Sequence, residues 1–187
     1  FKHSLKIRSE LFYDLPVKIV IMSGVEGKNE EIVDILNIAT ILMNDIGSGI
    51  FCHSLIDDLK LISDYPNYKK LLDEAEKRSI DRNRIIFADP LPLDKHLARH
   101  SLGDLGLDTF NYNGHTTTSD ALWAGLPVLT KTGESFAARV STSILQTIGV
   151  QELITVNERE YEEKALQLAT ENNELKRIKT KIINSRN

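Results

Sequence analysis

Cysteine is nearly absent from this chain, because Cys52 is the only one among 187 residues. A single cysteine excludes an internal disulfide framework and fits a reducing compartment. Long apolar runs are missing too, and none approaches the roughly 18 residues that a membrane helix needs. We therefore expect no membrane association and a location in the nucleus and cytoplasm. The chain begins at Phe1 rather than methionine, so we also expect it to be a piece of a longer protein.

No strong excess of charge is present either. Lys and Arg number 23 against 27 Asp and Glu, which gives a net charge of −4. A nucleic-acid binder normally shows a basic face, so no nucleic-acid partner is expected. The sequence has no G-x-x-x-x-G-K-[ST], no G-x-S-x-G and no Asp-x-Asp pair. The first two absences exclude a P-loop nucleoside triphosphatase and a hydrolase of the nucleophile-elbow type. The last removes the usual carboxylate ligands for a metal-bound nucleotide sugar, and the histidines show no metal-ligand spacing with Cys52.

What the chain does contain is an alternation of short apolar strands and amphipathic helices, with hydrophobic residues at 41%. Such an alternation with short connections predicts an α/β fold, a Rossmann-like parallel sheet with flanking helices. The expected strands are 17–22, 84–87, 105–109, 128–130 and 153–156, and the expected helices are 68–79, 95–100, 116–124, 158–170 and 171–187. A turn followed by one more helix is expected to begin at 133–135 and to be closed by Gly149. Residues 32–43 fit either a helix or a strand. We expect Trp123 to pack between helix and sheet, and Phe136 to face the core.

The stretch Leu105–Thr130 reads as one strand–helix–strand unit with an anion site. A glycine-containing turn leads into a helix that begins near Thr116. The first N–H groups of a helix have no internal partner and lie at the positive end of its dipole, which suits phosphate. His115, Thr116 and Thr117 add side-chain donors. An alternative stays open: Thr117 and Asp120 have the spacing of a capping box and would then only cap the helix.

In a parallel sheet the loops after the strands open at one edge, where ligands bind. His96 follows one strand, and His115 to Thr117 follow the next. Asp120 lies one helical turn beyond Thr116 on the same face. Phosphate donors, a carboxylate for a ribose diol and the flat ring of His96 together predict a nucleotide pocket, although His96 also fits a plain surface histidine. Gly47-Ser48-Gly49 lacks the third glycine of a dinucleotide fingerprint, so no nicotinamide or flavin site is expected there.

The residues from Arg84 to Leu175 closely resemble the C-terminal catalytic lobe of the protein O-GlcNAc transferases. NGHTT at 113–117 followed by DALWAG at 120–125 is a specific combination. The resemblance implies a B-type glycosyltransferase, in which two Rossmann-like lobes enclose UDP-GlcNAc. That family transfers N-acetylglucosamine to Ser and Thr hydroxyls of nuclear and cytosolic proteins and needs no metal or other cofactor. This chain would supply the UDP-binding half.

The resemblance also implies roles for single residues. His115, Thr116 and Thr117 match the helix start that contacts the diphosphate, and Asp120 matches the ribose carboxylate. The two remaining UDP-binding positions lie on the preceding loop and helix: Leu91 matches the backbone contact to the base edge, and His96 matches the imidazole against the uracil. No catalytic residue of the family falls on this chain.

Departures from the family define the expected domain organisation. Residues 1–47 are interpreted as a remnant of the family's intervening region and 48–187 as the UDP-binding lobe, apparently incomplete. Leu93 stands where the family has a ribose-contacting lysine, and Lys60 is one residue out of register with a phosphate-binding lysine. A helix and a strand expected before Tyr68 are absent, which would leave the sheet with an unpaired edge or a rearranged centre.

The chain lacks the N-terminal lobe with its candidates for proton transfer, the helical repeats that bind acceptor proteins, and the final helix. We therefore expect UDP binding without turnover by the isolated chain. Two alternatives stay open. The first is a non-catalytic remnant that binds UDP or a partner protein, and the second is another two-lobe nucleotide-sugar enzyme such as an epimerase.

Overall fold

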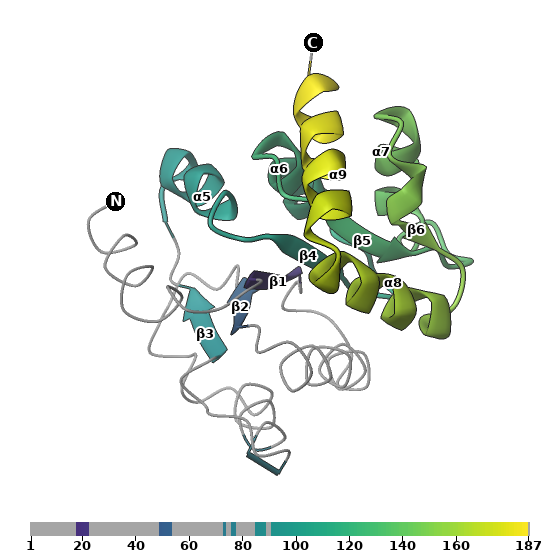
Figure 1. Ribbon diagram of the computed structural model, residues 1–187, viewed down its shortest axis with the longest axis horizontal. Coiled ribbons are helices and arrows are strands. Elements are labelled where there is room, and N and C mark those ends of the chain that lie inside the picture. The colour runs from purple at the N-terminus through teal and green to yellow at the C-terminus, as the bar shows by residue number, and fades with distance from the viewer. Residues whose placement is uncertain are drawn as a thin grey trace.

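The computed structural model describes residues 18–22, 49–53, 73, 76–77, 85–88 and 91–186 (Figure 1). Their strands form one six-stranded sheet in the order β3-β2-β1-β4-β5-β6, with every neighbouring pair parallel. The strands are β1 (Lys18–Met22), β2 (Gly49–His53), β3 (Ile85–Ala88), β4 (Leu105–Asp108), β5 (Val128–Lys131) and β6 (Ile154–Thr155). This order reverses direction between β1 and β4, as in doubly wound nucleotide-binding folds. The predicted parallel α/β sheet is confirmed.

Five α-helices accompany the strands in the described ranges: α5 (Leu93–His100), α6 (Thr116–Trp123), α7 (Val140–Thr147), α8 (Glu158–Thr170) and α9 (Asn172–Asn184), with a short 3-10 helix, η2 (Gln151–Leu153). Local sequence explains several boundaries. Gly125 and Gly149 follow α6 and α7 with φ of 87° and 75°, a left-handed conformation that favours glycine at helix ends. The Asn157 side chain accepts a hydrogen bond from Glu160 N and begins α8.

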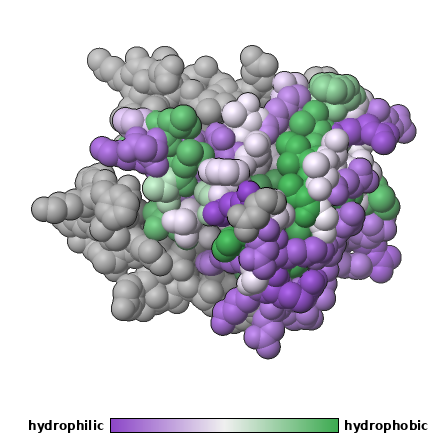
Figure 2. Space-filling view, turned by 90° about the horizontal axis from the view of Figure 1, so that it is seen from above, coloured by the Kyte–Doolittle hydropathy of each residue, from purple (hydrophilic) through white to green (hydrophobic). Residues whose placement is uncertain are grey.

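The core lies where α8 packs over β4 and β5 and where α9 packs against α8 and α6 (Figure 1). Leu105 and Leu107 of β4 and Leu129 of β5 have no solvent exposure, and neither has Tyr161 of α8. In the view of Figure 2, hydrophilic side chains cover much of the described surface and hydrophobic ones lie between them. None of the helices in the described ranges is long and apolar enough to cross a membrane.

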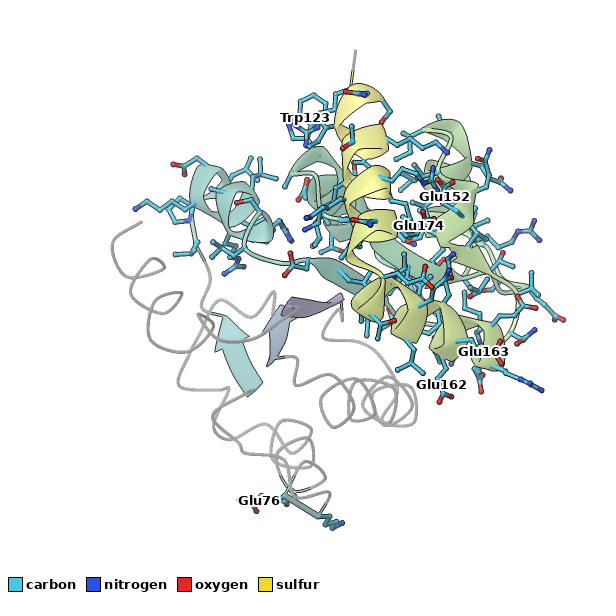
Figure 3. All side chains as sticks on the ribbon, viewed as in Figure 1. Glu76, Trp123, Glu152, Glu162, Glu163 and Glu174 are labelled. Carbon is cyan, nitrogen blue, oxygen red and sulfur yellow. The ribbon has the colours of Figure 1, made fainter. Side chains whose placement is uncertain are left out.

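Two predictions about the core are wrong. Phe136 is 83% exposed, because α7 begins only at Val140 and the residues before it form a turn that breaks the helical period. Ile144 does pack against the core, as the same pattern predicted. Trp123 is 62% exposed, because it is the last residue of α6. Figure 3 shows it beside the C-terminal end of α9, and its ring lies 6.0 Å from the guanidinium of Arg186.

The sheet crosses the predicted domain boundary at residues 47 and 48. β1 belongs to the first predicted region, yet it lies between β2 and β4 of the second. Each described strand is hydrogen-bonded to its neighbour in this order. Several predictions lie outside the described residues. They concern the rest of 1–47 with its ambiguous segment 32–43, Lys60, and most of the expected helix 68–79. Gly49 begins β2.

Candidate functional site

The start of α6 has unused backbone donors. His115 is the N-cap residue, and the first backbone bond of the helix runs from Ser119 N to His115 O at 3.1 Å. Within the described residues, the N–H groups of Thr116, Thr117 and Thr118 have no hydrogen-bond acceptor. Three free donors at the positive end of a helix dipole form an anion-binding arrangement. No side chain caps this helix, so the capping-box alternative for Thr117 and Asp120 is wrong.

The turn before α6 is hydrogen-bonded to a buried carboxylate. Asp108 ends β4 and has no solvent exposure. Its Oδ1 accepts from Gly114 N at 2.7 Å and Thr109 N at 3.0 Å, and its Oδ2 accepts from Thr130 Oγ1 at 2.6 Å. Burial raises the pKa of Asp108 to about 6, and these hydrogen bonds act in the opposite direction. The carboxylate therefore links β4, β5 and the turn.

Gly114 is held from the other side by α7. Ser141 Oγ donates to Gly114 O at 2.9 Å and lies 2.9 Å from Thr118 Oγ1. A Cβ at position 114 would lie 2.5 Å from Thr118 Oγ1 and 2.7 Å from Thr117 Oγ1. These distances are too short for real contacts, so the close approach of the helix's first turn requires glycine here.

His115 lies against two exposed aromatic side chains. Its ring stacks on Tyr112 with centroids 4.8 Å apart and an interplanar angle of 12°, and Phe136 approaches edge-on at 6.2 Å. The Nε2 atom of His115 is buried and has no hydrogen-bond partner among the described residues. A buried polar atom without a partner is unfavourable, so this nitrogen keeps a hydrogen-bonding capacity that no described residue uses.

His96 of α5 and Asp120 of α6 face each other. His96 Nε2 lies 4.0 Å from Asp120 Oδ2, beyond hydrogen-bond distance. On its own helix, His96 is 2.8 Å from Arg99 Nη2 and 3.3 Å from His100 Nε2. Burial and then Arg99 lower the pKa of His96, while Asp120 acts in the opposite direction. His96 is therefore neutral at pH 7, next to an Asp120 side chain that is 25% exposed.

The structure thus brings together five of the six predicted site residues. His115, Thr116 and Thr117 form the start of α6, Asp120 lies one turn further, and His96 packs beside it. The sixth, Leu91, is half-buried on the segment just before α5. Leu93, at the position of the family's lysine, is the first residue of α5 and is 66% exposed.

Several residues of this site were not found by sequence reasoning: Asp108, Thr130, Ser141, Arg99 and His100. One signal was available for Asp108. A carboxylate at the end of the apolar run LGLD belongs to a buried strand, and a buried charge persists only where hydrogen bonds or opposite charges surround it. The other four are ordinary polar residues whose partners become visible only in three dimensions.

Together these features define a Rossmann-like lobe whose loop after β4 ends in an anion-binding helix start. The model of glycosyl transferase family 41 matches residues 62–187. The chain belongs to this family.

Relatives of known sequence agree with this assignment. The chain is 40% identical over 106 residues to a UDP-N-acetylglucosamine–peptide N-acetylglucosaminyltransferase of Caenorhabditis elegans, covering 57% of this chain and 9% of that protein. It is 42% identical over 96 residues to the probable enzyme of the same name, SEC, of Arabidopsis thaliana, covering 51% and 10%. The chain spans about a tenth of the length of these curated relatives.

Solved structures show the same fold. An O-GlcNAc transferase mutant of Thermobaculum terrenum superposes with a TM-score of 0.74 at 25% identity, over 92% of this chain and 34% of that one. The C-terminal CMP-Kdo binding domain of WaaA from Acinetobacter baumannii has a TM-score of 0.63 over 98% of this chain and 96% of that one. At 9% identity, this second likeness shows the fold alone.

Proposed function

We propose that this chain is the UDP-binding half of an enzyme that transfers N-acetylglucosamine from UDP-GlcNAc to Ser and Thr hydroxyls of intracellular proteins. Family membership and the names of the relatives support the reaction. The observation that carries the proposal is the start of α6, where the N–H groups of Thr116 to Thr118 have no acceptor among the described residues and the Nε2 of the N-cap residue His115 has no partner there either. A diphosphate offers the acceptors that these donors need.

The other predicted site residues contact the ribose and the uracil. Asp120 accepts hydrogen bonds from the ribose diol, since its carboxylate lies one helical turn from the phosphate donors and is partly exposed. His96, neutral at pH 7, lies against the uracil ring, and Leu91 contacts the base edge through its backbone. A neutral imidazole suits this role because the uracil carries no charge to pair with a cation.

The contribution of this half of the enzyme to catalysis is electrostatic. Negative charge grows on the diphosphate as the bond to the sugar breaks, and fixed N–H groups at a helix start stabilise that charge without reorganising. We infer that the α6 amides and His115 do this in place of a metal ion. The proton transfer from the acceptor hydroxyl and the binding of acceptor proteins belong to regions outside this chain, and the enzyme acts in the nucleus and cytoplasm.

Complementation in trans tests this function. The chain is mixed with the N-terminal lobe of a family 41 enzyme, and transfer of radiolabelled N-acetylglucosamine to an acceptor peptide is followed with and without EDTA. We expect transfer only in the mixture, unaffected by EDTA and lost with His115→Ala. The matched variant Ser119→Ala changes an exposed residue of the same helix and should keep activity. Transfer by the isolated chain contradicts the proposal, and silence of the mixture despite UDP binding favours the non-catalytic alternative.

A further inference from the structure

Asp108 is a charged residue in a place where the fold alone would accept an apolar one. It is the last residue of β4, and the three residues before it in the strand are all buried. Its carboxylate is buried completely, which is unfavourable for a charge unless the surroundings compensate. None of the nucleotide-binding roles proposed above belongs to Asp108. The presence of a buried charge at this position therefore needs another explanation.

The hydrogen bonds of this carboxylate join both ends of the turn before α6 to the neighbouring strand β5. Oδ1 takes the N–H of Thr109, where the turn begins, and the N–H of Gly114, where it ends. Oδ2 takes the hydroxyl of Thr130 on the neighbouring strand β5, which fixes the carboxylate itself. Asp108 therefore closes the turn between β4 and α6 as a ring and attaches that ring to the sheet.

Gly114 is the residue immediately before the N-cap of α6, and both of its polar backbone groups are fixed. The N–H is bonded to Asp108 and the C=O to Ser141 of α7. The direction of the next amides, those of Thr116 and Thr117, follows from the orientation of this residue because only His115 lies between. Two buried side chains, from β4 and α7, thus set where the free N–H groups of α6 point.

We propose that Asp108 is a positioning residue for the diphosphate, which it serves by holding Gly114 so that the free amides of α6 converge on the ligand. This inference rests on the proposed function, because it presupposes that UDP binds at α6. Asp108 acts through the turn and does not touch the nucleotide. Its effect should therefore fall on the phosphate part of UDP and leave the uridine part, held by His96 and Asp120, unchanged.

The readout is the ratio of UDP to uridine affinity, which a purely structural role would not move. Asp108→Ala removes the acceptor of Gly114 N–H, so we expect UDP affinity to fall about tenfold or more, since an unpaired buried donor is strongly unfavourable, while uridine affinity stays within about twofold. Asp108→Asn keeps an oxygen for Gly114 N–H and an amide that can donate to Thr130 Oγ1, and it should restore most of the ratio. Ser141→Ala should lower the ratio in the same direction.

Tyr161→Phe is the matched control. The Tyr161 hydroxyl donates to the backbone O of Asp108 at 3.1 Å, so its loss destabilises the same buried neighbourhood without releasing Gly114. We expect it to lower the melting temperature and to keep the ratio. Should Asp108→Ala fail to fold, Ser141→Ala and Asp108→Asn decide: an unchanged ratio in Ser141→Ala overturns the proposal. Equal losses for UDP and uridine in a folded Asp108→Ala also overturn it. A wild-type chain that does not prefer UDP to uridine overturns the proposed function, and this inference with it.

Discussion

At the scale of single residues, Asp120 is the proposed acceptor for the hydroxyl groups of the ribose. Its carboxylate is one quarter exposed and lies next to a neutral His96, so it is free to accept hydrogen bonds from a ligand. We predict that Asp120→Ala weakens the binding of both UDP and uridine by about 1–3 kcal/mol, because hydrogen bonds to a charged group are lost and the ribose is common to both ligands. Titration calorimetry measures both, with Ser119→Ala as the control on the same helix. Unchanged affinity for both ligands is the outcome that removes Asp120 from the site.

Asp108 should also leave a signature in the pH dependence of stability. Its pKa is about 6 in the folded protein against 3.8 for an ordinary Asp, and burial is the main cause. Between these two values the folded state binds a proton that the unfolded state does not, so the contribution of this group to stability falls as pH rises. Above pH 6 the loss is complete and amounts to about 3 kcal/mol by linkage.

Urea denaturation from pH 4 to pH 7.5 measures this effect by comparing wild type with Asp108→Asn, which cannot ionise. The pKa of buried His100 is lowered to about 4, and this group lowers stability as pH falls in both proteins alike, so the difference between them isolates Asp108. We predict that the variant gains stability relative to wild type as pH rises toward 6 and that the gain is constant above it. A difference that does not vary with pH shows that Asp108 titrates normally.

At the scale of elements, the junction of β4 with α6 depends on the size of residue 114. Gly114→Ala would place a methyl group within 2.7 Å of two threonine hydroxyls, and Thr118 is buried and stiff at χ1. We predict a loss of stability of about 1–3 kcal/mol, as for other overpacked sites, together with weaker UDP binding. Thermal unfolding and calorimetry check the two effects.

Gly149→Ala is the control for that experiment. Gly149 has φ of 75° with open space around it, so alanine there is strained but meets no neighbour. This substitution also lowers stability, by about 1–2 kcal/mol from the left-handed conformation alone. It lies beyond the end of α7, away from the start of α6, and should leave UDP affinity unchanged. If both variants reduce UDP affinity equally, the effect at Gly114 is one of general stability.

Elements with local signals were predictable from the sequence. The cap residue Asn157 and the glycines after α6 and α7 define helix ends by chemistry within a few positions, and α8 was predicted with its correct bounds. The extent of the turn before α7 was not, because it depends on a bond between Asn113 N and Ala137 O, which are far apart in sequence. Asp108 was missed for the same reason: its partner Thr130 lies 22 residues away in sequence.

At the scale of the whole molecule, the sheet explains why one nucleotide site is expected where it is. The strand order reverses between β1 and β4, and the loop after β4 lies at that point. Ligands of doubly wound sheets bind in the crevice beside such a reversal. The sequence predicted the parallel sheet but not the pairing of β1 with β4, because a strand carries no local mark of the partner it pairs with. The free end of α6 is thus set by the topology as well as by its own residues.

The most direct measurement is titration calorimetry of the chain with UDP and with uridine, repeated for His115→Ala. The account predicts that wild type binds UDP at least about tenfold more tightly than uridine, since charge-assisted hydrogen bonds to the diphosphate contribute about 1.5–3 kcal/mol each. It predicts further that His115→Ala loses UDP affinity and keeps that for uridine. Absence of UDP binding, or equal affinity for UDP and uridine in wild type, would contradict the assignment of the α6 start as the diphosphate site.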